Sequence, residues 1–444
     1  MNREDGHVPQ PRAPHGTPPG GQFTTRERAE ADLTLDSPEA SGSPWRIGWE
    51  QHPWKGPEER ISATQRRKIA GPYWAAVPAE IADLRVDLEP DTIAEAADST
   101  LAITHFDNDV THALEHVREN ESAEIAPLAA VLLRTESASS SQIENVTAGA
   151  RQLALATIGE RTGTNATLVA RNVSALQTAL ALADRIDGQT ILAMHDALLS
   201  QTDPDIAGKV REQQVWVGGG NHGPHGASFV PPHHTRVQAA LDDLWRFCDR
   251  TDIPPLTQAA IAHAQFETIH PFADGNGRVG RALVHAMLRR AGVTRRMIVP
   301  TSAGLLVDVR SYFDALGRYR EGNLGAITRQ FSWAANSAVA NGRQMVDELV
   351  AARARWHDEI EARKDAAVWR LTDLVIRQPA VTVNAVRENL AVAQSVAQNA
   401  IDQLEAVGAL RKINSYKRNR VWESPEVLSA LDDFAVRAGR RGVA

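Results

Sequence analysis

Apolar residues recur at spacings of three and four along most of the chain after residue 90. This spacing is typical of amphipathic helices, which complete a turn about every 3.6 residues. It predicts helices over residues 92–106, 109–117, 123–135, 165–183, 188–200, 235–249, 256–269, 280–291, 307–319 and 324–364. The expected fold class is therefore mainly α.

One segment carries a strand pattern instead. Two short runs are separated by a Gly- and His-rich turn and are followed by Pro231 and Pro232. They consist of Val215, Trp216 and Val217, and of Ser228, Phe229 and Val230. Two such runs joined by a turn predict a β-hairpin with exposed backbone edges.

The pattern changes again near residue 366. Short helices are predicted over residues 371–377, 384–390 and 396–407, and two strand-like runs, 409–413 and 420–422, flank a basic turn. This is the order of a winged helix-turn-helix, so we expect a small domain of that type over residues 366–444.

The partner of this domain is left open by its charges. The turn contains Lys417, Arg418 and Arg420 and could contact DNA phosphates as a wing does. The candidate recognition helix, however, contains Asp402 and Glu405 and no Lys or Arg. DNA is therefore a less favoured partner than another protein or a second copy of the chain, and a homo-oligomer stays open.

Composition limits the remaining choices. The chain has 444 residues, with 48 Lys and Arg against 55 Asp and Glu, so any nucleic-acid contact must be a local patch. Cys248 is the single cysteine, which excludes an intramolecular disulfide and a Cys-built zinc site. Neither a secretory signal nor a membrane span is evident. We expect a cytoplasmic protein that does not contact the membrane.

Residues 1–44 are rich in Pro, Gly, Ser and Thr and contain few large aliphatic residues. Such a segment buries too little apolar surface to offset the entropy of ordering, so we expect a flexible tail. Order is expected to begin at Trp45, where a cluster of aromatic residues starts.

The candidate chemistry lies between two predicted helices, in residues 270–281. Gly275, Asn276 and Gly277 form a bare turn at the start of a helix, where backbone N–H groups and the helix dipole favour a phosphate. Arg278 and Arg281 share one face of that helix and can bind further phosphate oxygens.

Two residues ahead of the turn complete this set. Asp274 is a hard oxygen ligand suited to a magnesium ion that bridges phosphates. His270 is the nearby group that can accept a hydroxyl proton near neutral pH. Each residue alone is also typical of a turn or a solvated helix face, but four complementary roles within twelve residues favour phosphate chemistry.

The segment resembles the signature of the Fic family, His-Pro-Phe-x-Asp/Glu-Gly-Asn-Gly-Arg-x-x-Arg, at every specified position. The resemblance implies a Fic-type helical core with a β-hairpin flap, and transfer of AMP from ATP to a Ser, Thr or Tyr hydroxyl of a protein. It implies that His270 is the base, that Asp274 holds Mg²⁺, and that the glycine turn, Arg278 and Arg281 bind ATP.

The resemblance also assigns two further regions. The predicted hairpin is similar to the family's flap, which pairs with an extended target segment and places its hydroxyl over the histidine. Tyr312 is similar to an aromatic residue near the adenine. Gly277 favours AMP transfer, because members that resemble Doc and phosphorylate carry Lys there. Removal of AMP by the same site, phosphorylation, and a DNA-binding regulator with a nucleotide-sensing core remain alternatives.

A second motif lies upstream. Ser140, Glu144 and Asn145 fit the Ser/Thr-x-x-x-Glu-Gly/Asn pattern that resembles the inhibitory motif of some Fic proteins. There, Glu144 would pair with Arg281 and displace the γ-phosphate. We therefore expect an N-terminal helical region over 45–135, a core with the inhibitory helix over 136–341 and a connecting helix over 342–365.

Overall fold

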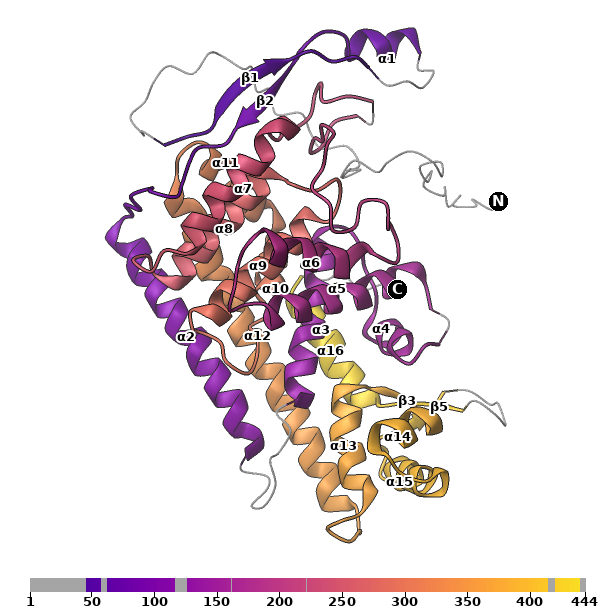
Figure 1. Ribbon diagram of the computed structural model, residues 1–444. Helices are drawn as coiled ribbons and strands as arrows, with labels where there is room; N and C mark the ends of the chain where they lie inside the picture. The colour runs from indigo at the N-terminus through magenta and orange to yellow at the C-terminus, as the bar shows by residue number, and fades with distance from the viewer. Residues whose placement is uncertain are drawn as a thin grey trace, which may run out of the picture.

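The computed structural model describes residues 45–56, 62–115, 126–160, 162–220, 222–413 and 420–439. The expected flexible tail, residues 1–44, lies outside the described residues. Helices dominate the described part, so the mainly α fold class is confirmed (Figure 1). No helix within these ranges is long and apolar enough to cross a membrane.

Helix α8 (Pro255–Ile269) lies at the centre because its sequence is apolar or small on nearly every side. All residues from Leu256 to Ile269 are buried. The helix packs against α7 (His234–Cys248), α9 (Asn276–Arg290) and α12 (Leu324–Glu359). Its C-terminal end is thus held on several sides, which fixes the chain that follows it.

Helix α2 (Pro90–Glu115) runs along the 36-residue helix α12 (Figure 1). The two helices predicted over 92–106 and 109–117 are one helix, because the chain between them contains no Pro or Gly. Gly342 on α12 lets the helices approach, since a Cβ there would lie 3.0 Å from the Phe106 ring. Asn336 also donates to Ser99 Oγ at 2.9 Å.

Most of the other helices of this part surround the same core. They are α3 (Ala126–Ile143), α4 (Ala150–Thr157), α5 (Thr164–Ala181), α6 (Gly188–Leu199), α10 (Thr301–Val307) and α11 (Val309–Arg320). The short helix α1 (Ala63–Lys68) lies outside this core, beside the N-terminal strands (Figure 1). Helix α3 continues well beyond residue 135, where its predicted helix ends, and so carries Ser140 within it.

A two-stranded sheet near the N-terminus was not predicted. Strands β1 (Gly48–His52) and β2 (Tyr73–Val77) pair antiparallel, with Gly48 opposite Val77. Strand β2 buries its small residues Ala75 and Ala76 and leaves Trp74 exposed, so its apolar pattern does not alternate as a half-buried strand should. Packing against the segment around Phe229 and Val230 stabilises it instead.

That segment is the predicted hairpin, and it forms only in part. Val217 and Phe229 make one isolated antiparallel bridge, with Val217 N donating to Phe229 O at 2.8 Å. Ala76 N of β2 donates to Val230 O at 3.0 Å, so this end of the expected free edge is already paired. Val215, Phe229 and Val230 are buried, whereas Ser228 is exposed and Trp216 is half-buried.

The C-terminal part contains the three predicted short helices, α13 (Ala367–Arg377), α14 (Val383–Leu390) and α15 (Gln394–Ala406). Three strands form a sheet in the order β3 (Ala380–Thr382), β5 (Val421–Glu423), β4 (Arg411–Lys412). Lys417 and Arg418 of the predicted basic turn lie outside the described residues. The winged-helix assignment and the predicted boundaries stay predictions.

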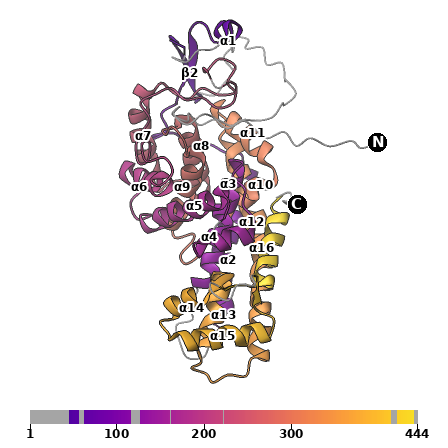
Figure 2. The ribbon, with the colours of Figure 1, turned by 90° about the vertical axis from the view of Figure 1, so that its right-hand side faces the viewer.

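Helix α16 (Pro425–Arg437) was not predicted and connects this part back to the core (Figure 2). It packs along α12, and Arg437 Nε donates to Asn341 Oδ1 at 2.6 Å. Arg151 of α4 also pairs with the buried Glu423 at 2.6 Å. The C-terminal part therefore contacts α12 and α4, and its helices α13 and α16 also contact α3, which carries Ser140 of the candidate inhibitory motif.

Candidate active site

His270 lies at the point where α8 ends. It adopts the left-handed conformation, with φ of 51°, and its N–H donates to Phe266 O at 2.8 Å. Its carbonyl accepts from Arg211 Nε at 2.8 Å, and the same buried guanidinium donates to Pro232 O at 2.6 Å. Arg211 therefore fixes the backbone of the candidate base.

The imidazole of His270 is buried beside a carboxylate. His270 Nδ1 lies 3.6 Å from Glu267 Oε2. Burial, together with the positive charges of Arg211 and Arg320, lowers the pKa of His270 to about 3. The imidazole is therefore neutral at neutral pH, as a proton acceptor must be. Because Nδ1 faces Glu267, Nε2 is left for a substrate.

Glu267 has an unusual environment of its own. Burial raises its pKa to about 7, and the negative charge of Glu144 acts in the same direction. A Cβ on Gly280 would lie 3.0 Å from Glu267 Oε1, so the absence of a side chain there makes room for this carboxyl. The sequence pattern did not single out Glu267, because its spacing on α8 is that of a core position.

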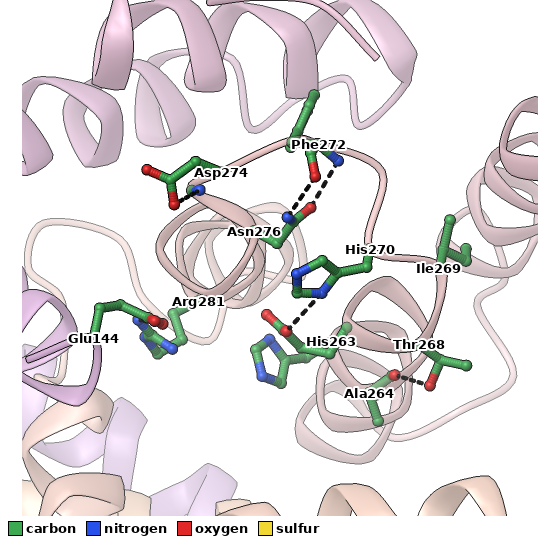
Figure 3. Close-up of polar contacts among 12 residues, drawn as sticks. Glu144, His263, Ala264, Thr268, Ile269, His270, Phe272, Asp274, Asn276 and Arg281 are labelled. Atoms are coloured by element: carbon green, nitrogen blue, oxygen red, sulfur yellow. Dashed lines mark hydrogen bonds and ion pairs between the residues drawn. The ribbon is translucent and has the colours of Figure 1, made fainter. Parts of the chain in front are cut away.

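The turn after His270 is stabilised by hydrogen bonds between the Asn276 side chain and the Phe272 backbone. Phe272 N donates to Asn276 Oδ1 at 2.8 Å, and Asn276 Nδ2 donates back to Phe272 O at 2.9 Å (Figure 3). Gly275 has φ of +81° and precedes the first residue of α9. The left-handed glycine and the paired bonds place the start of α9 directly after the turn, as the motif predicts.

His195 also holds this turn in place, a role that the sequence analysis did not predict. Its Nδ1 accepts from Gly208 N and its Nε2 donates to Asp274 O, both at 3.0 Å. Its ring stacks on Phe272 with centroids 3.8 Å apart. Burial lowers the pKa of His195 to about 4, so the ring is neutral. A lone histidine on an apolar helix gives no sequence signal for such a role.

Asp274 and Arg278 face each other across the first turn of α9. Asp274 Oδ1 accepts from Gly275 N at 2.7 Å, and Oδ2 lies 3.3 Å from Arg278 Nη2. No group of three His, Cys, Asp or Glu side chains with metal-binding spacing occurs in the described ranges. A lone, partly exposed carboxylate fits Mg²⁺ held mainly by phosphate oxygens and water rather than by a protein cage.

Arg281 is engaged by the candidate inhibitory motif. Arg281 Nη2 donates to Glu144 Oε1 at 2.9 Å, and the two side chains lie together in Figure 3. Arg281 Nη2 also donates to Ser140 O at 2.8 Å, and Nε donates to Ser140 Oγ at 2.9 Å. Asn145 adopts the left-handed conformation, with φ of 60°, just after α3 ends. The structure thus brings the upstream motif and the helix α9 together.

The Glu144 carboxylate also lies against the glycine turn. A Cβ on Gly277 would overlap Glu144 Oε1 and would lie 2.9 Å from Arg281 Nη1. An anionic group therefore occupies the space above the start of α9, where the motif predicts phosphate oxygens. Any side chain at residue 277 would collide with this carboxylate.

Tyr312, which the sequence analysis expects near the adenine, lies on α11. Its ring is buried, and its hydroxyl lies 2.7 Å from His263 Nε2 beneath Arg281. Burial raises the pKa of the hydroxyl. Tyr312 packs beside His263 in the described conformation, and its place near an adenine stays a prediction.

Residues 185–288 match the Fic/DOC family. The chain contains a Fic domain. A protein adenylyltransferase fic-1 from Caenorhabditis elegans is 38% identical over 112 residues, which are 24% of this chain and 20% of that protein. A protein adenylyltransferase Fic from Aedes aegypti is 32% identical over 165 residues, 37% of this chain and 28% of that protein. The chain thus spans less than a third of either relative's length.

A solved Fic family protein from Desulfovibrio desulfuricans G20 is similar in structure to this chain. Its TM-score is 0.47 at 19% identity, over 76% of this chain and 97% of its own. The matched Fic domain contains His270 and the whole turn through Arg281, together with His195 and Arg211. Glu144 and Tyr312 lie outside the matched residues.

Proposed function

We propose that the Fic domain transfers AMP from ATP to a hydroxyl side chain of a protein. In this reaction the hydroxyl oxygen bonds to the α-phosphorus of ATP, the bond from that phosphorus to the β-phosphate oxygen breaks, and pyrophosphate leaves. His270 Nε2 takes the hydroxyl proton. The neutral imidazole beside Glu267 supports this role, because the carboxylate at Nδ1 can stabilise the imidazolium that forms.

The nucleotide is proposed to bind at the start of α9. The N–H groups of Asn276 and Gly277 would hold phosphate oxygens, and Gly275 N would join them once Asp274 Oδ1, which now accepts from it, turns toward the metal. Arg278 and Arg281 would neutralise the remaining charge. Asp274 would hold Mg²⁺, which would neutralise phosphate charge when bound.

The position of the Glu144 carboxylate is the observation that supports this proposal most directly. It lies on Gly277 and bonds to Arg281, so the site accepts an anion in the described conformation. A carboxylate there stands in for a terminal phosphate group. The family match and the relatives named as adenylyltransferases support the choice of AMP as the transferred group.

The same contact supports autoinhibition. While Ser140 and Glu144 occupy Arg281, that guanidinium is not free to hold the γ-phosphate, so ATP would bind weakly or with its α-phosphate out of line. Asn145 would end the inhibitory helix at the position where Glu144 can turn toward Arg281. Release of α3 would therefore activate the enzyme.

The target protein is proposed to dock beside the partial hairpin. Val217 N and O already bond to Phe229 and Ser228, so an extended segment would add its backbone hydrogen bonds at the neighbouring, half-buried Trp216 and Gly218. The edge at Val230 is already paired with β2, so docking is proposed at the 215–217 side. We place the reaction in the cytoplasm, where the single cysteine would stay reduced.

Intact-mass analysis of the purified chain with ATP and Mg²⁺ tests the proposed reaction. We expect the chain, or a protein in a lysate, to gain the mass of AMP, and His270→Ala to abolish the gain. His105→Ala, a change on the exposed face of α2, is the matched control and should keep the activity. A gain of one phosphate instead of AMP contradicts the proposal.

A further inference from the structure

Arg320, the last residue of α11, lies between three parts of the chain that meet beside the candidate site. Its guanidinium carbon lies 3.6 Å from the centre of the Phe229 ring in the partial hairpin. Its Nη2 lies 3.5 Å from Glu267 O, and its Nε lies 3.5 Å from Thr268 Oγ1, both in the last turn of α8. Its carbonyl accepts from Ile47 N at 3.1 Å. One residue therefore contacts the hairpin, the end of α8 and the chain that leads into β1.

The charge of Arg320 suits both of its side-chain contacts. A guanidinium over the face of an aromatic ring is attracted by the negative charge of that face. The carbonyl of Glu267 belongs to the C-terminal end of α8, which carries the partial negative charge of the helix dipole. Arg320 is thus attracted to the hairpin and to α8 at once, whereas an apolar side chain of the same length would fill the space without this attraction.

Phe229 connects Arg320 to the edge at which the target is proposed to dock. Its carbonyl accepts from Val217 N at 2.8 Å. Val217 lies between Trp216 and Gly218, where the extended target segment would add its hydrogen bonds. Trp49 of β1 also packs on the Phe229 ring, edge to face, with centroids 6.3 Å apart. The position of the docking edge relative to α8 therefore depends on where the Phe229 ring is held.

We propose that Arg320 is a positioning residue that fixes the distance between the partial hairpin and His270. This inference rests on the proposed AMP transfer and names the residue that sets its acceptor geometry. His270 directly follows the last turn of α8, so a guanidinium that joins this turn to Phe229 sets how far the target hydroxyl lies from His270 Nε2. A displacement of about 1 Å at a reacting centre can lower a rate by about 100-fold.

Amide hydrogen exchange tests the position of the hairpin without a need for activity. Arg320→Met keeps a long side chain and removes the planar charge. We expect peptides that contain Val217 and Ser228, whose N–H groups form the hairpin bonds, to exchange about tenfold faster than in wild type. The exchange of Phe272 N, in the turn before α9, should not change. Arg318→Met, which changes an exposed arginine of the same helix, is the matched control and should leave all these rates unchanged.

Steady-state kinetics separate positioning from nucleotide binding. The rates are measured in the Glu144→Gly chain with labelled ATP, well below the thermal midpoint of each variant. Arg320→Met should lower the maximal rate of AMP transfer by about tenfold and leave the KM for ATP within about twofold of its parent. Arg320→Lys, which keeps a positive charge over the ring but not the planar contact, should recover part of the rate. A tenfold higher KM for ATP at an unchanged maximal rate would place the guanidinium on the nucleotide and overturn the positioning role.

The remaining outcomes distinguish this inference from the proposed function. Hairpin exchange in Arg320→Met equal to that of wild type overturns the positioning role, whatever the rate of AMP transfer. Faster exchange together with an unchanged rate also overturns it, because the hairpin would then move without consequence for the reaction. If neither wild type nor Glu144→Gly transfers AMP, the proposed function is contradicted, while faster exchange in Arg320→Met still supports the contact by which Arg320 holds the hairpin.

Discussion

At the scale of single residues, burial sets the chemistry of the candidate site. It keeps His195 and His270 neutral and raises the pKa of Glu267 toward neutrality. His270 and the glycine turn could be predicted from the sequence because the motif is contiguous. The roles of Glu267, His195 and Arg211 could not be predicted in this way, because they depend on contacts that only the folded chain makes.

His195→Phe tests the support of the turn. The substitution keeps a ring that can stack on Phe272 but leaves Asp274 O and Gly208 N without their partner. We expect an increase of about tenfold in the KM for ATP and a loss of about 2 kcal/mol of unfolding free energy. His195→Gln, which can still donate to Asp274 O, should recover part of the affinity. Equal KM values for wild type and His195→Phe would contradict the positioning role.

The raised pKa of Glu267 predicts a pH dependence of stability. The pKa of the carboxyl is about 7 in the folded chain and about 4.5 in the unfolded chain. Its contribution to the free energy of unfolding is therefore fully present below pH 4.5 and is lost as the pH rises through 7. The shift corresponds to about 3 kcal/mol at most. Relative to Glu267→Gln, the thermal midpoint of wild type should therefore fall between pH 4.5 and 7. A constant difference across this window would contradict the raised pKa.

At the scale of elements, α3 is the element on which regulation is proposed to depend. Its periodicity predicts a helix, but it does not predict that a buried pair of polar side chains, Glu136 and His285, holds this helix against the core. Glu136 Oε1 lies 2.9 Å from His285 Nε2 of α9, and Glu136 Oε2 accepts from Ser302 N of α10 at 2.9 Å. Such contacts join residues far apart in the chain, which a local pattern does not reveal.

Glu136→Gln tests whether this pair holds α3 in place. The change keeps the size of the side chain but removes its charge beside His285, so we expect a loss of about 2 kcal/mol of unfolding free energy. The rate of AMP transfer should rise severalfold, because α3 is held less firmly against the core. The rise should be smaller than after removal of Glu144, because the Glu144 carboxylate is still present. Glu95→Gln, on the exposed face of α2, is the control. Destabilisation without any gain in activity would show that the pair stabilises the fold only.

At the scale of the whole molecule, the sequence predicts the main parts but not how they pack. The helical core and the short helices of the C-terminal part follow from periodicity, because their apolar faces repeat regularly. The β1–β2 sheet and α16 were missed, since each is stabilised by contacts with distant segments such as Phe229 and Asn341. Through α13 and α16 the C-terminal part contacts α3, the helix proposed to control the site, and through the Arg151–Glu423 pair it contacts α4.

The most direct test of the account compares wild type, Glu144→Gly and the double variant Glu144→Gly, His270→Ala in the rate at which AMP is incorporated from α-labelled ATP with Mg²⁺. Glu144→Gly frees Arg281 and the space above Gly277, so we expect a rate at least tenfold above wild type. The double variant should incorporate no AMP. A Glu144→Gly rate equal to that of wild type would contradict the inhibitory role, and incorporation by the double variant would contradict His270 as the base.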